Sequence, residues 1–117
     1  QAGATDRPEA QKTFGIQARN LAKLSAAGMT IAMGTDGFSP WSQHAEMADM
    51  VASGMTPGQV IVAATKNSAA FLQLADTGTV EAGKRADLIA VAGTPLDDIA
   101  VMEDVRFVMK AGVVYKD

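Results

Sequence analysis

A short, unbroken apolar run, Met29–Met33 (MTIAM), constrains the fold of this chain more than any other feature. The run follows Gly28 directly and leads into Gly34-Thr35-Asp36. A continuous apolar run of this length predicts a strand that is covered on both faces, as in a parallel sheet. Such a strand needs parallel neighbours, and the surrounding α/β part of the chain offers no second candidate. The rest of the sheet is therefore expected to come from other polypeptide.

A helix is expected on the N-terminal side of this run. Phe14, Leu21 and Leu24 recur at helical spacing, and Gly28 stands where a helix C-cap is favoured. Residues up to about Thr13 are polar and rich in Ala and Gly, which predicts a frayed lead-in. Helix, glycine and buried strand together form one step of a β/α repeat.

Two further helices are expected after the run. The first carries an apolar stripe, begins at a Ser39 or Ser42 cap and ends at Gly54. Its stripe consists of Met47, Met50 and Val51. The second begins at Thr56-Pro57-Gly58-Gln59, where threonine and glutamine form a capping box around proline at the first helical position. We expect it to continue to Leu74. Its expected buried positions are Val60, Ala64, Phe71 and Leu74.

The chain is expected to change character near residue 76, with an α/β part at 1–76 and a β part at 77–117. Turn formers and β-branched residues predict short strands at Gly78–Val80 and Asp87–Ala92. TPLDDI predicts a turn with a single helical loop. The end predicts a hairpin, in which Arg106–Met109 and Val113–Lys116 flank Lys110-Ala111-Gly112.

Composition excludes several classes of function. The chain has 117 residues, enough for one domain, and a net charge of −3. Its Lys and Arg residues are scattered and form no basic patch of the kind that binds nucleic acid. No apolar run approaches the ~20 residues that cross a bilayer, so no membrane partner is expected. The absence of cysteine excludes disulfides and thiolate metal sites. The compartment is left open, a cytoplasmic location being only the default for a cysteine-free chain whose first residue is Gln1.

Asp36 and His44 are the candidate site residues. If Met29–Met33 is a barrel strand, Asp36 lies at its C-terminal end, where a carboxylate can ligate a divalent metal and take a proton from metal-bound water. Gly34 and Gly37 flank it and allow a sharp turn and close approach of a ligand. Spacing alone equally fits a turn residue or N-cap, the commoner use of Asp-Gly after a strand. His44, the only histidine, fits either a partly exposed helix start or a ligand or substrate contact.

A count of ligands limits what the chain can do alone. A catalytic zinc site takes about three protein ligands. With one histidine, no cysteine and one well-placed aspartate, the isolated chain is expected to hold no metal and to be inactive as a hydrolase.

These residues resemble the C-terminal part of the amidohydrolase superfamily, in its imidazolonepropionase-like and Xaa-Pro-dipeptidase-like branch. The resemblance rests on GTDG, then HAEMADMVASGMTPGQVIVAATKNSAAFLQLADTGTVEAGKRADLIAVAGTPLDDI, then VRFVMKAGVVYKD. It implies an α/β fold: the last elements of a (β/α)8 barrel with Met29–Met33 as the eighth strand, plus part of a small composite β-sandwich. It further implies one or two divalent metals, usually zinc, with Asp36 as metal ligand and catalytic proton shuttle. His44 is then a substrate-binding residue.

The resemblance also implies that this chain is a fragment, because the family's His-x-His pair, its bridging lysine or glutamate and its two later histidines would lie upstream of Gln1. The expected function is that of the C-terminal part of a metal-dependent hydrolase of C–N bonds, acting on a small amide, cyclic amide or dipeptide. The alternative is a non-catalytic structural or binding domain. In either case we expect self-association, since the apolar faces of Met29–Met33 and of the Met-bearing helices need cover.

Overall fold

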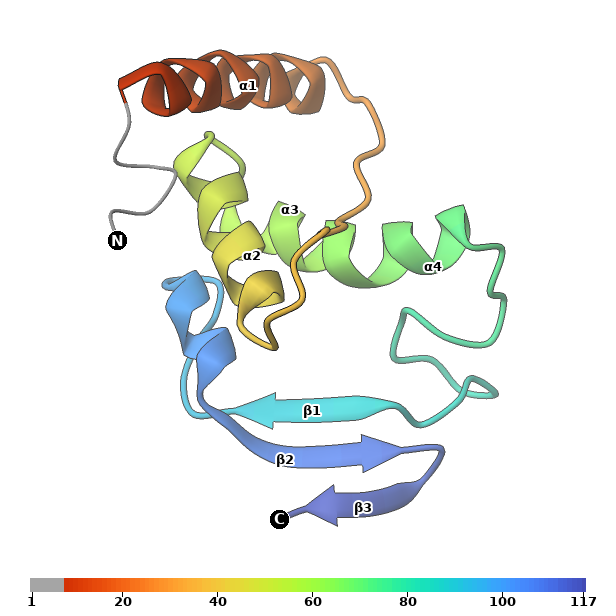
Figure 1. Cartoon of the computed structure of the whole chain (residues 1–117). Helices are drawn as coiled ribbons and strands as arrows, with labels where there is room; N and C mark the ends of the chain where they lie inside the picture. Colours follow the sequence, from red (N-terminus) through yellow and green to blue (C-terminus); the bar gives the residue numbers. More distant parts are fainter. Residues whose placement is uncertain (1–7) are drawn as a thin grey trace.

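The computed structural model describes residues 8–117, in three tiers: α1 at one end, the shorter helices in the middle and a sheet at the other end (Figure 1). The helices are α1 (Pro8–Ala26), α2 (Ser42–Ala52), α3 (Pro57–Val62), the π-helical turn η2 (Ala63–Asn67), α4 (Ser68–Phe71) and the 3-10 helix η3 (Ile99–Glu103). The strands are β1 (Leu88–Val91), β2 (Val105–Lys110) and β3 (Val113–Lys116). No helix among these described residues combines the length and hydrophobicity needed to cross a membrane.

The glycines predicted to end the first two helices do so. Gly28 has φ +81°, and the backbone N–H groups of Gly28 and Met29 donate to Ser25 (3.0 Å) and Leu24 (3.1 Å), which is a Schellman motif after α1. Gly54, with φ +108°, ends α2 in the same way. The predicted lead-in is partly wrong, since α1 already begins at Pro8; residues 1–7 lie outside the described part of the chain.

The predicted strand Met29–Met33 is wrong for this chain. The segment is irregular and forms no ladder. Its side chains alternate, with Ile31 and Met33 half-buried and packed against the core, and Thr30 and Ala32 exposed. A strand is stabilised by hydrogen bonds to neighbouring strands, and within residues 8–117 no strand lies beside this segment. Ile31 and Met33 instead bond to η2 and α4, which continue the helix that starts at Pro57.

That helix begins as predicted but ends early. Thr56 Oγ1 accepts from the Gln59 N–H (3.2 Å) and Gln59 Oε1 accepts from the Thr56 N–H (2.9 Å), which completes the capping box. Val60 is fully buried, as predicted. The helix stops at Phe71 because Gln73 adopts φ +58°, and the Leu74 N–H then turns back to Ala69 (2.9 Å). Phe71 (79% exposed) and Leu74 (47% exposed) were wrongly expected to be buried.

The C-terminal residues form an antiparallel sheet in the order β1-β2-β3. The hairpin between β2 and β3 is confirmed, with Ala111 (φ +50°) and Gly112 (φ +80°) as the left-handed pair of a two-residue turn. β1 confirms the strand predicted within Asp87–Ala92. The strand predicted at Gly78–Val80 is wrong. Those residues lie in a loop that the Arg85 guanidinium and backbone N–H close onto Asp76 (3.0 and 2.8 Å).

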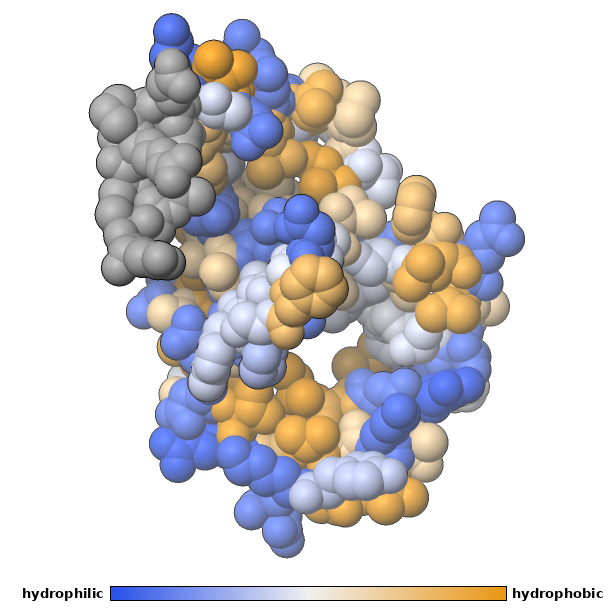
Figure 2. Space-filling view, viewed as in Figure 1, coloured by the Kyte–Doolittle hydropathy of each residue, from blue (hydrophilic) through white to orange (hydrophobic). Residues whose placement is uncertain are grey.

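The core lies in the helical part, between α2, α3 and η3. Its buried members are Met47, Met50, Met55, Val60, Ala63 and Ile99. The helix α3–α4 and β1 face each other across a hollow of ≈ 710 Å³, whose hydrophobic lining is visible in Figure 2. The molecule exposes 8335 Å², whereas a compact monomer of this mass exposes about 6,000 Å². Much apolar surface that a closed domain would bury is therefore open.

Candidate functional site

Asp36 ends the extended segment and begins the loop that leads into α2. The segment from Met29 to Met33 runs along the helix, and Asp36 follows three residues later with its side chain exposed. The Thr35 hydroxyl accepts the Gly37 N–H (3.0 Å), which tightens the chain around Asp36. The carboxylate is therefore presented to solvent from a braced turn.

Gly37 allows this turn to lie directly against α2. A Cβ at Gly37 would clash with Ser42 Oγ and stand 2.6 Å from Ser42 Cβ, so a larger residue would push the loop away from the helix. A Cβ at Gly34 would meet nothing within 4 Å. The two glycines that flank Asp36 thus differ: Gly37 sets the position of the loop, and Gly34 leaves space beside the backbone.

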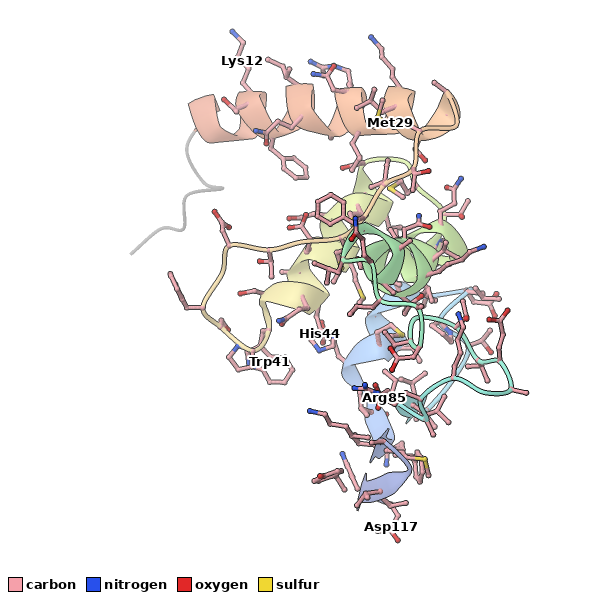
Figure 3. The ribbon with its side chains drawn as sticks, turned by 90° about the vertical axis from the view of Figure 1, so that its right-hand side faces the viewer. Lys12, Met29, Trp41, His44, Arg85 and Asp117 are labelled. Atoms are coloured by element: carbon pink, nitrogen blue, oxygen red, sulfur yellow. The ribbon has the colours of Figure 1, made fainter. Side chains whose placement is uncertain are left out.

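His44 lies in the first turn of α2, beside Trp41 (Figure 3). The two rings have centroids 5.9 Å apart and planes inclined by 45°. His44 Nδ1 is buried and has no hydrogen-bond partner among the described residues. The predicted serine cap is wrong, because Trp41 occupies the N-cap and Ser39 Oγ accepts from the Trp41 N–H (3.2 Å).

Glu46 is a member of this site that the sequence analysis missed. Burial raises the pKa of its carboxyl, and the neighbouring carboxylates of Asp49 and Asp36 raise it further. The loop after Gly34 thus brings Asp36 close enough to α2 for its charge to act on Glu46. No local pattern in the sequence reveals this pairing, because it depends on how the loop folds back.

The described residues do not form a metal site by themselves. No group of three or more His, Cys, Asp or Glu side chains within residues 12–117 is arranged to hold an ion. Asp36 offers one exposed carboxylate, which fits a single ligand position, and a complete site would need further ligands from other polypeptide.

A groove runs beside the extended segment. It has a volume of ≈ 550 Å³. Its lining residues are Thr30, Ala32, Met33, Gly34, Asn67, Ala70 and Phe71. The groove opens beside the chain that leads to Asp36.

Comparison with known proteins places these features in a family. Residues 1–115 match the amidohydrolase family. The chain is 38% identical over 96 residues to an ochratoxinase of Aspergillus niger (77% of this chain, 20% of that protein). It is 32% identical over 118 residues to an imidazolonepropionase of Deinococcus deserti (93% and 29%).

Among solved structures, the chain is similar to a Xaa-Pro dipeptidase with methionine bound in its active site. The TM-score is 0.79 at 38% sequence identity, over 86% of this chain and 25% of the dipeptidase. The chain therefore spans about a fifth to three-tenths of the length of these relatives.

Proposed function

The chain belongs to the amidohydrolase family, and we propose that it is the C-terminal part of a metal-dependent hydrolase that cleaves carbon–nitrogen bonds. The observation that carries the proposal is the placement of Asp36, an exposed carboxylate on a braced turn at the end of the extended segment. The names of the relatives, imidazolonepropionase and Xaa-Pro dipeptidase, suggest a small cyclic amide or dipeptide as substrate.

In this proposal, residues 29–33 become the last strand of a (β/α)8 barrel once upstream polypeptide provides the neighbouring strands. The alternation of half-buried Ile31 and Met33 with exposed Thr30 and Ala32 supports this assignment. So does the open groove beside them, because an extended segment with an unoccupied flank has room for a neighbour.

Asp36 is the residue that would bind the metal and carry the proton. One or two divalent ions, most simply zinc, would supply an activated water and polarise the substrate carbonyl when bound. The Asp36 carboxylate accepts the proton of the attacking water and passes it to the departing nitrogen.

His44 would contact the substrate from the start of α2. Its Nδ1 lacks a partner within the described residues, so the ring is not committed to a structural hydrogen bond there. Trp41 packs beside the ring.

The proposal is tested in the longer protein that contains this chain, with Asp36→Asn. We expect hydrolysis of an Xaa-Pro dipeptide or a cyclic amide to fall by about 10²–10⁴-fold, with circular dichroism unchanged. Asp49→Asn is the matched control, since Asp49 is also an exposed carboxylate that acts on Glu46. An equal loss of activity in both variants, or none in Asp36→Asn, would refute the role of Asp36.

A second candidate is a non-catalytic, self-associating domain. The exposed apolar side chains around the hollow favour it, Leu72 (63% exposed) and Val80 (85% exposed) among them. Sedimentation of the isolated chain across a hundredfold dilution tests this. We expect the isolated chain to associate, to lack hydrolase activity and to lose zinc on dialysis. A monomer that retains stoichiometric zinc would contradict both the expected association and the expected loss of zinc.

A further inference from the structure

We propose that Asn67 and Ser68 are positioning residues that hold the backbone leading to Asp36. Together with the π-helical turn η2 they form a clamp on residues 31–33. The inference rests on the proposed function for its consequence in catalysis, whereas the clamp itself rests on the hydrogen bonds of this chain.

Asn67 makes the longest-range link of the clamp. Its Nδ2 donates to the backbone carbonyl oxygen of Ile31 (2.9 Å), 36 residues earlier in the chain, and the side chain is partly buried. No strand lies beside the extended segment within residues 8–117, and the Asn67 amide supplies a donor to this part-buried carbonyl. An unpaired carbonyl at this partly buried position would cost free energy, which makes the bond more valuable than an exposed one.

The π-helical turn provides the second link. A turn with i→i+5 bonding changes which carbonyls meet N–H groups of their own helix. The carbonyl oxygen of the buried Ala63 accepts the Met33 N–H (3.1 Å), which joins the extended segment to the helix. Ser68 Oγ lies 2.7 Å from the same oxygen and 3.3 Å from the Met33 carbonyl oxygen. The hydroxyl has a single proton, which favours the shorter bond to Ala63, so Ser68 chiefly stabilises the π-helical turn η2.

The clamp determines where Asp36 can lie. Asp36 is three residues after Met33, and three residues of extended chain span at most about 10 Å. On its other side, Gly37 is fixed by the Thr35 hydroxyl and by close approach to Ser42. Asp36 thus lies between two fixed parts of the backbone, residues 31–33 on one side and Gly37 on the other. Release of the first one frees the carboxylate to move by an ångström or more, which can lower catalysis by about 10²-fold.

The test uses Asn67→Asp, which keeps the shape of the side chain but removes the N–H donor. Thr65→Val is the matched control. It is also close in shape, lies in the same turn, and removes a local side-chain bond (Thr65 Oγ1 to the Ile61 carbonyl oxygen, 2.7 Å) that does not reach residues 31–33. Ser68→Ala and the conservative Ser68→Thr form a second pair.

Two readouts are needed. Hydrogen exchange of this chain should be faster over residues 30–36 in Asn67→Asp and unchanged over the β2–β3 hairpin. In the longer protein, kcat should fall about tenfold to a hundredfold with KM within about threefold, because the carboxylate moves while the substrate pocket stays. Ser68→Ala should show a weaker version of both effects, and Ser68→Thr should restore them.

The outcomes separate the two claims. If Asn67→Asp and Thr65→Val give the same exchange over residues 30–36, the clamp is wrong, whatever the activity. If exchange rises but kcat matches that of Thr65→Val, Asn67 is structural and the positioning role is wrong. If the unsubstituted longer protein hydrolyses no amide, the proposed function fails, and with it the catalytic consequence of the clamp.

Discussion

Gly78 lies where the loop after α4 packs against the helix, and its replacement by alanine gives a quantitative test of that contact. Gly78 has φ +94°, and a Cβ there would stand 2.6 Å from Ala69 Cβ and 3.1 Å from the carbonyl oxygen of Thr65. A helix carbonyl cannot rotate away, so the loop would have to move. Gly83 has a similar φ of +87°, but its Cβ would meet nothing within 4 Å.

The magnitude follows from a comparison of these two glycines. An L-residue in the left-handed region costs about 1–2 kcal/mol, and the loss of glycine entropy from the unfolded chain returns about 0.4–1 kcal/mol. Both terms are shared by Gly78→Ala and Gly83→Ala. The contact with Thr65 and Ala69 adds an overpacking cost of about 1–3 kcal/mol in Gly78→Ala alone. The difference between the variants should therefore be about 1–3 kcal/mol.

Urea unfolding, followed by circular dichroism and Trp41 fluorescence at one protein concentration, measures this difference. Gly78→Ala should unfold at a lower urea midpoint than Gly83→Ala with the same m-value. Equal midpoints would mean that the loop does not rest on α4 as described. A larger loss in Gly83→Ala would show that an unrecognised contact forms there.

Three other variants probe separate elements. Thr56→Ala should lower the free energy of unfolding by about 1 kcal/mol because it removes half of the capping box. Ala111→Asn should raise it by up to about 1 kcal/mol, since asparagine tolerates the left-handed φ; unchanged thermal denaturation would contradict this. The raised pKa of Glu46 means that its protonated form stabilises the fold below pH 4.5 and that this contribution is lost as the pH rises through the raised pKa. Glu46→Gln should therefore raise Tm at neutral pH but not below pH 4.5, and the opposite pH dependence would refute the assignment.

The features that could be predicted from the sequence are those fixed by near neighbours. The capping box at Thr56 and Gln59, the helix stops at Gly28 and Gly54, and the β2–β3 hairpin each depend on a few adjacent residues. The position of Asp36 just after an extended segment is of the same kind.

The features that could not be predicted depend on distant or absent partners. Within residues 8–117 no strand lies beside Met29–Met33, and no other described element covers Phe71 and Leu74. The influence of Asp36 on Glu46 depends on the path of a loop, and the bond from Asn67 to Ile31 depends on a widened helical turn. No periodicity in the sequence encodes either of these.

The bonds from Ala63 and Asn67 to residues 31–33 also have a consequence for protein synthesis. A ribosome delivers the Asp36 segment before the helix that begins at Pro57, so the carboxylate emerges first and is anchored only after Asn67 has been made. A product that stops between Gly37 and Pro57 would keep Asp36 in its sequence but have nothing to hold it in place. In this chain, the shape of the Asp36 segment therefore depends on a helix that is synthesised after it.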